Sequence, residues 1–203
     1  MAMQESLILT IVHSILNGVI RVTMGSVYRL FGIRKEERTL RHAEIYLITT
    51  TALFVLLVIV AQYWLRFGWV VIVLGNLRIL QIISLNLNTL LFETSPIGDD
   101  TDSQKKARWH FVAIGFSFFD TVWIFGFMYQ FLDRLYGVLN HRLSSLLDFL
   151  YYAVMTMTTI GYGDIYPVMS LGRLVAMYQA LISIMFLVFF VNGALGRLQR
   201  RTV

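Results

Sequence analysis

The sequence predicts an all-α membrane protein, and three observations lead to this fold class. Of the 203 residues, 57% are hydrophobic, whereas roughly half is usual in a soluble domain. Four apolar stretches are each near the ~20 residues that a helix needs to cross a bilayer, namely 45–65, 69–92, 109–132 and 171–195. A further segment, 144–158, has a helical pattern but is too short to cross. A short helix and Gly-rich backbone between two spans predict a re-entrant loop.

The composition argues against several other classes of protein. The chain has no Cys, so it has neither a disulfide nor a thiolate metal site. Its formal net charge is +5, but the basic residues border the apolar stretches, which argues against nucleic-acid binding. No nucleophile–base set or metal cluster stands at a useful spacing, so we expect no enzyme activity. The N-terminus lacks a basic region before its apolar run, so we expect no cleaved signal peptide.

Residues 5–32 form an amphipathic pattern. Polar side chains recur at three- and four-residue steps opposite an apolar stripe, with Thr10, His13, Ser14, Asn17 and Arg21 facing away from Leu7, Ile8, Ile11, Ile15 and Val22. Because Arg21 and Arg29 would be costly inside lipid, a helix lying in the membrane interface fits this pattern best. A fifth span is the alternative.

The placement of positive charge indicates how the chain is oriented. Ten basic residues flank one set of span ends: Arg34, Lys35, Arg38, Arg41, Lys105, Lys106, Arg108, Arg197, Arg200 and Arg201. The opposite ends hold Arg66, Arg134, Arg142 and Arg173. Because positive residues favour the cytoplasmic side, we expect both termini in the cytoplasm, a multi-pass protein of the cell membrane, and an outward-opening loop at 144–164.

Residues 156–164 read Thr-Met-Thr-Thr-Ile-Gly-Tyr-Gly-Asp, and they carry the most specific signal in the chain. The two Gly residues that flank Tyr allow backbone conformations closed to other residues. Together with the run from Asp164 to Arg173, which includes Pro167, this motif resembles the potassium channel family over about 109–196. In such channels, filter carbonyls of four chains replace the hydration shell of the ion. The resemblance implies that permeant K⁺ is held here by Thr159, Ile160, Gly161, Tyr162 and Gly163.

The expected organisation follows from the spans and the resemblance. Residues 1–42 form a cytoplasmic interfacial segment, 43–92 two additional transmembrane helices, 93–108 a cytoplasmic linker, 109–196 the pore domain and 197–203 a short cytoplasmic tail. Asp99, Asp100 and Asp102 in the linker lack the spacing of a calcium loop, so we expect a solvated turn. No internal repeat is evident, so one chain supplies one filter strand and a homotetramer is expected.

Side chains beside the filter are expected to brace it. Tyr151 and Tyr152 stand where the family often has Trp, and Tyr151 is placed to hydrogen-bond Asp164. Plain aromatic packing at the membrane interface is an equal alternative. Asp133 and Asp148 also lie on the predicted outer side, where we expect ordinary solvated charges.

The run from Asp164 to Arg173 fixes the register of the inner helix. In that register Ser183 replaces the family's hinge Gly, so a bend there is not implied. Four side chains are expected to face the axis near the cytoplasmic end and to form a gate that closes by dewetting: Ile184, Leu187, Val191 and Leu195. The alternative is that any apolar membrane helix shows this spacing.

Arg78 and Asp120 both lie inside apolar spans, where charges are costly and are usually paired or functional. Arg78 is nine residues past Trp69, or ~13 Å, and Asp120 is eleven residues past Trp109, or ~16 Å. In a hydrocarbon core of ~30 Å these depths nearly coincide. We therefore expect an intramembrane ion pair between the second span and the outer pore helix.

Arg78 also begins a polar stripe with Gln81, Ser84 and Asn88. One Arg moves too little charge for steep voltage dependence. We expect this stripe to be a polar face that packs on the pore rather than a voltage sensor.

The sequence therefore predicts a homotetrameric potassium channel subunit with passive conduction, embedded in the lipid bilayer. The alternatives are a pore-contributing or modulatory subunit of a heteromeric cation channel, or a non-selective cation channel. We expect gating to come from the membrane, residues 1–42, the 93–104 loop, pH, voltage or a separate regulatory protein.

Overall fold

The computed structural model describes residues 7–30, 40–92, 103–141, 143 and 145–199. These residues form helices, without any β-strand. In order they are α1 (Leu7–Leu30), α2 (Leu40–Ala61), a 3₁₀ turn η2 (Leu65–Phe67), α3 (Gly68–Phe92), α4 (Ser103–Tyr136), α5 (Leu146–Met157) and α6 (Ser170–Gln199). The predicted all-α membrane fold is confirmed.

Four helices are long and apolar enough to span a bilayer, at Arg41–Ala61, Gly68–Phe92, Arg108–Tyr136 and Ser170–Gly193. They coincide with the four predicted spans. Two helices extend further than the apolar stretches, since α4 begins at Ser103, inside the predicted 93–108 linker, and α6 continues to Gln199. The first span was predicted to end at 65, but α2 ends at Ala61. Hydropathy marks only the apolar part of such a helix, whereas the backbone hydrogen bonds continue through its polar ends.

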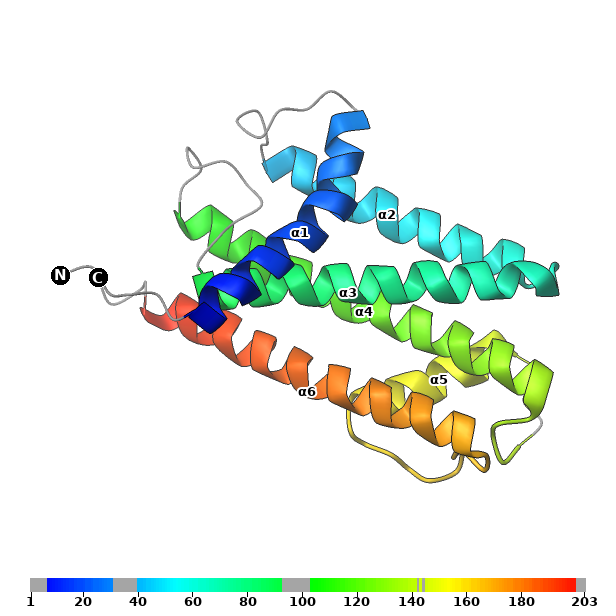
Figure 1. Ribbon diagram of the computed structural model, residues 1–203. Helices are drawn as coiled ribbons and strands as arrows, with labels where there is room; N and C mark the ends of the chain where they lie inside the picture. Colours follow the sequence, from blue (N-terminus) through cyan, green and yellow to red (C-terminus); the bar gives the residue numbers. More distant parts are fainter. Residues whose placement is uncertain (1–6, 31–39, 93–102, 142, 144, 200–203) are drawn as a thin grey trace.

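The helices form one bundle around α4 (Figure 1). The short helix α5 packs against both α4 and α6, and α1 crosses α3 obliquely. The beginning of α1 and the end of α6 lie at the same end of the molecule. A bundle in which α5 is enclosed by α4 and α6 places the loop after α5 beside the beginning of α6.

Buried aromatic side chains of α4 form the centre of the core. Phe125 and Tyr129 are fully buried, and the Phe125 ring meets the ring of Tyr178 on α6 at 5.4 Å between centroids. Gly126 permits the close approach of α5, because a Cβ atom there would lie 3.3 Å from the Cα atom of Leu150. Small residues have this role at many helix crossings in membranes.

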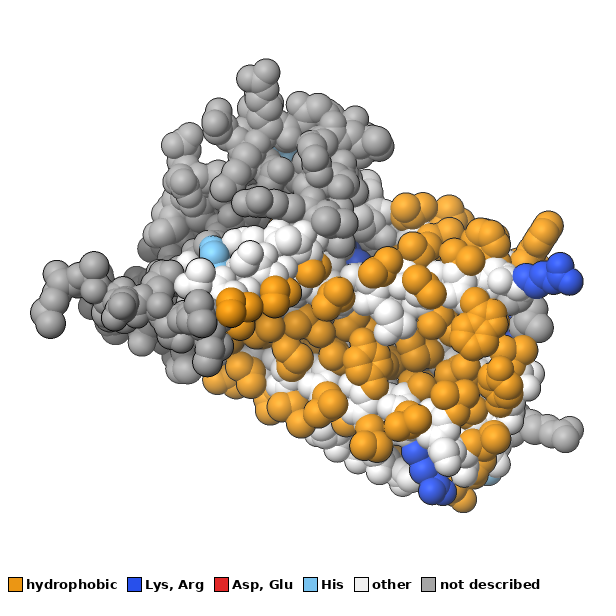
Figure 2. Space-filling view, in the orientation of Figure 1, with side chains coloured by type: hydrophobic (Ala, Val, Ile, Leu, Met, Phe, Trp, Pro, Cys, Tyr) orange, Lys and Arg blue, Asp and Glu red, His pale blue; other side chains and the backbone are white. Residues whose placement is uncertain are grey.

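Apolar side chains also cover the outside of the bundle. Hydrophobic atoms occupy most of the described part of the face in Figure 2. Among the exposed hydrophobic residues are Leu53 and Leu56 on α2 and Val73 and Leu77 on α3, each about half exposed. An apolar patch of this extent would be a liability in water but suits contact with lipid.

Candidate ion-conduction site

The helix α5 begins with a capping box. The Leu147 N–H donates to the Ser145 Oγ atom at 3.1 Å, and the Ser145 N–H donates to a carboxylate oxygen of Asp148 at 3.3 Å. Two backbone N–H groups at the start of α5, which have no partner within the helix, are thereby hydrogen-bonded. Asp148 is therefore a helix cap, which corrects the expectation of a merely solvated charge.

The backbone after α5 alternates in handedness. Thr159, Gly161 and Gly163 have positive φ values of 61°, 51° and 81°, whereas Ile160 and Tyr162 do not. Alternation of this kind gathers N–H groups on one side of the chain and leaves carbonyl oxygens to the other. The Ile160 and Gly161 N–H groups both donate to the Met155 carbonyl, at 3.0 and 3.1 Å. Donors of this segment are thus directed at the end of α5.

The predicted filter residues are all exposed in the single chain. The side chains of Ile160 and Tyr162 are 52% and 70% exposed. A positive φ at the non-Gly residue Thr159 costs about 1–2 kcal/mol. A strained and uncovered segment needs further contacts to hold it.

Two side chains hold the outer end of this segment. The Tyr151 hydroxyl donates to the Asp164 carboxylate at 2.8 Å, and the Asn140 side-chain amide donates to the Asp164 carbonyl at 2.9 Å. Asn140 also accepts from the Tyr166 N–H at 2.8 Å. The hydrogen bond between the Tyr151 hydroxyl and the Asp164 carboxylate lowers the pKa of Asp164 and raises the pKa of Tyr151.

Tyr152 has a different environment from that of Tyr151. It is buried, and its ring meets that of Tyr129 edge-on at 4.7 Å between centroids. The Tyr129 hydroxyl donates to Gln179 at 2.8 Å, and Gln179 in turn donates to the Ala153 carbonyl at 2.7 Å. This buried polar chain joins α4, α6 and α5.

Sequence reasoning did not single out Tyr129, Gln179 or Asn140. A Gln on an otherwise apolar helix is a detectable signal for Gln179, because a buried amide needs partners. Ser183, at the family's hinge position, lies within a continuous helix, and its hydroxyl contacts the Met157 sulfur at 3.3 Å. Asp133 accepts a hydrogen bond from the Leu139 N–H at 2.8 Å and is therefore also more than a solvated charge.

Three of the four predicted gate residues lie on an exposed face of α6. Ile184, Leu187 and Val191 are 59%, 65% and 50% exposed, whereas Phe186 and Phe189 are buried. The side chain of the fourth, Leu195, lies outside the described residues. The buried residues of α6 face α4 and α5, so the gate residues face away from the chain's own core.

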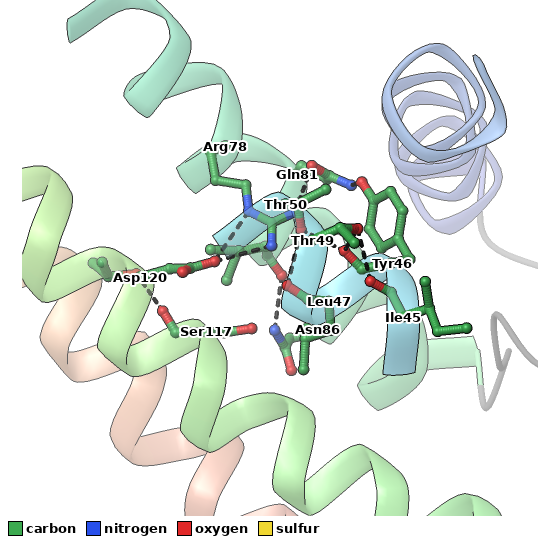
Figure 3. Close-up of polar contacts among 12 residues, drawn as sticks. Ile45, Tyr46, Leu47, Thr49, Thr50, Arg78, Gln81, Asn86, Ser117 and Asp120 are labelled. Atoms are coloured by element: carbon green, nitrogen blue, oxygen red, sulfur yellow. Dashed lines mark hydrogen bonds and ion pairs between the residues drawn. The ribbon is translucent and has the colours of Figure 1, made fainter. Parts of the chain in front are cut away.

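Arg78 and Asp120 form an ion pair in the structure. The Arg78 Nε and Nη2 atoms donate to the same Asp120 oxygen at 3.2 and 2.9 Å. The Arg78 Nη1 atom donates to Gln81 at 3.1 Å, and the guanidinium lies 5.8 Å from the ring centre of Tyr46. Figure 3 shows this cluster, which draws on α2, α3 and α4. The buried charges are therefore both paired and hydrogen-bonded.

Two further residues of the polar stripe on α3 bond the additional helices rather than α4 or α6. Gln81 donates to the Tyr46 hydroxyl on α2, and Asn88 donates to Asn17 on α1 at 3.0 Å. In this stripe Arg78 provides the ion pair with α4. The prediction overlooked that α1 and α2 offer polar partners of their own.

The order of a helix, a short helix with an irregular loop, and a second helix is similar to the arrangement that the sequence predicts for a potassium-channel-like unit. Residues 111–200, from α4 through α6, match the family model described as "Ion channel". The match covers less than half of the chain and supports an ion channel. No curated protein and no solved structure matches the chain.

Proposed function

We propose that this protein is a potassium-selective channel subunit of the cell membrane, and that four copies conduct K⁺ passively through a filter formed by residues 159–163. The observation that carries this proposal is the alternating handedness at Thr159, Gly161 and Gly163, with the donors of Ile160 and Gly161 engaged by the end of α5. Carbonyl oxygens on the free side would then be available as ligands.

Four copies are proposed because one strand cannot surround an ion. A dehydrated K⁺ ion needs several oxygen ligands, which strands around an axis supply as rings. The carbonyl end of α5, at Thr158, would aim a partial negative charge of about half a unit at the ion path. Both termini would lie in the cytoplasm.

Purified protein reconstituted into planar bilayers tests this proposal. The reversal potential should follow the K⁺ gradient and not the Na⁺ gradient. A reversal potential that ignores K⁺ would indicate a non-selective channel, and no current from the protein alone would indicate a modulatory subunit.

A pair of Gly variants identifies the filter. Gly161→Ala should abolish K⁺ selectivity, because a Cβ atom at φ 51° strains the backbone by about 1–2 kcal/mol. Gly115→Ala is the matched control, since a Cβ atom there also meets no atom within 4 Å but the backbone is helical. Equal selectivity in the two variants would contradict the assignment of the filter.

A further inference from the structure

A groove opens between the N-terminal parts of α2 and α4, and it has a volume of about 410 Å³. This volume is within the usual range for binding sites of small molecules. Both helices begin at the same end of the molecule in Figure 1, so the two walls run in the same direction. All of its lining residues belong to α2 and α4, and none belongs to α5 or α6.

The α4 wall of the groove changes from charged to apolar along its length. It consists of Lys105, Arg108, Trp109, Val112 and Phe116. These positions follow three- and four-residue steps, so they share one helix face. The predicted membrane span begins at Arg108, so the two cations stand at or just outside the membrane boundary. Trp109 lies at that boundary, where Trp is enriched in membrane proteins.

The α2 wall has the same order. Glu44 comes first and is followed by Leu47 and Ile48. Ile48 on this wall is 56% exposed, and Val112 on the opposite wall is 53% exposed. Among the described residues that line the groove, Lys105 and Arg108 are positively charged and Glu44 is negatively charged.

We propose that this groove binds one anionic glycerophospholipid of the leaflet in which α2 and α4 begin. Its phosphodiester would lie between Lys105 and Arg108, and an acyl chain would follow the apolar walls. Basic pockets between transmembrane helices recognise phospholipid head groups in this manner. A soluble anion would leave the apolar walls uncovered.

Fluorescence quenching can test this site directly, because Trp109 lies in it. A single-Trp protein with Trp64→Phe, Trp69→Phe and Trp123→Phe retains Trp109 as the reporter. It is reconstituted into phosphatidylcholine with phosphatidylglycerol, either lipid being brominated on the upper half of its acyl chains. Phosphatidylglycerol should associate with Trp109 about fivefold more strongly than phosphatidylcholine, corresponding to about 1 kcal/mol.

Two controls distinguish a built site from general attraction. Lys105→Gln with Arg108→Gln should reduce the preference to about one, whereas Arg66→Gln, at an exposed position outside the groove, should leave it unchanged. A protein that retains Trp69 instead, at the beginning of α3, should show no preference. The double variant must elute from a size-exclusion column at the same volume as the unmodified protein. If it does not, the two single variants, Lys105→Gln and Arg108→Gln, are measured instead.

Three outcomes would overturn the proposal: no preference at Trp109, a preference that survives loss of both cations, or the same preference at Trp69. None of them depends on ion conduction, so this test and that of the proposed channel activity can fail separately.

Discussion

The hydrogen bond from Tyr151 to Asp164 joins the beginning and the end of the re-entrant segment. Thirteen residues separate them, and the two oxygen atoms lie 2.8 Å apart. The Asp164 carbonyl is held in addition by Asn140, so its backbone and side chain have different partners. This arrangement makes Asp164 the residue through which Asn140 and α5 jointly position the end of the proposed filter.

Removal of the Tyr151 hydroxyl should make the protein more sensitive to acid. The hydrogen bond lowers the pKa of Asp164 below its ordinary value of 3.8. A carboxyl group with a lowered pKa stabilises the fold above its unfolded pKa, and this contribution is lost as the pH falls through the lowered pKa. In Tyr151→Phe, Asp164 should therefore bind a proton at a higher pH.

The measurement is K⁺ current as the pH on the outer side is lowered toward 3.8 and below. The acid midpoint of Tyr151→Phe should move to higher pH, while Tyr166→Phe, at an exposed Tyr, should behave as the unmodified protein does. An unchanged midpoint in Tyr151→Phe would show that the hydrogen bond does not control Asp164.

At the scale of residues, the sequence predicted contacts between residues close in the chain better than contacts between distant ones. The sequence offered a hydrogen bond from Tyr151 to Asp164 as one of two equal alternatives, and the structure contains this bond between residues of one short stretch. Asn140 and Gln179 bind backbone atoms 24 and 26 residues away, and no local pattern encodes such partners. The pairing of Arg78 with Asp120 was predicted across 42 residues. This was possible because the helical rise and the membrane thickness give the depth of each residue on the same scale.

At the scale of elements, α3 connects the additional helices to the channel unit. Its polar face bonds α1 through Asn88, α2 through Gln81 and α4 through Arg78. These contacts are directional and lie in an apolar surrounding, where an unsatisfied polar group is costly. The pairing of α3 with α4 is therefore fixed in register as well as in proximity.

Loss of Asp120 should destabilise the assembly strongly. The side chains of Arg78 and Asp120 are only 10% and 2% exposed, and leaving one buried charge without its partner costs about 3–5 kcal/mol. Asp120→Asn should lower the yield and thermal stability of solubilised protein. Adding Arg78→Gln should restore part of both, because no unpaired charge then remains.

The matched control is Arg66→Gln, the same change from Arg to Gln at an exposed position outside the groove. Size-exclusion chromatography and thermal melting in detergent report the result. A double variant that is no better than Asp120→Asn alone would argue against an energetic role for the pair.

At the scale of the whole molecule, the exposed apolar surfaces differ in their expected surroundings. Leu56 on α2 and Ile184 on α6 are exposed to nearly the same extent, at 56% and 59%. The proposed tetramer places Ile184 beside a water-filled path and Leu56 against lipid. Hydropathy cannot distinguish these two positions, because both side chains are apolar and both helices are long.

Cysteine modification can distinguish the surroundings of Ile184 from those of Leu56, since the chain has no Cys of its own. A water-soluble, cationic methanethiosulfonate reagent reacts with thiolates, which form only where water reaches. Ile184→Cys should therefore lose most of its K⁺ current after treatment from the cytoplasmic side. The K⁺ current of Leu56→Cys should not change, because lipid covers that position in the proposed tetramer. The current of Phe186→Cys should not change either, because that position is only 2% exposed. Inhibition of Leu56→Cys, or none of Ile184→Cys, would place the ion path elsewhere than along this face of α6.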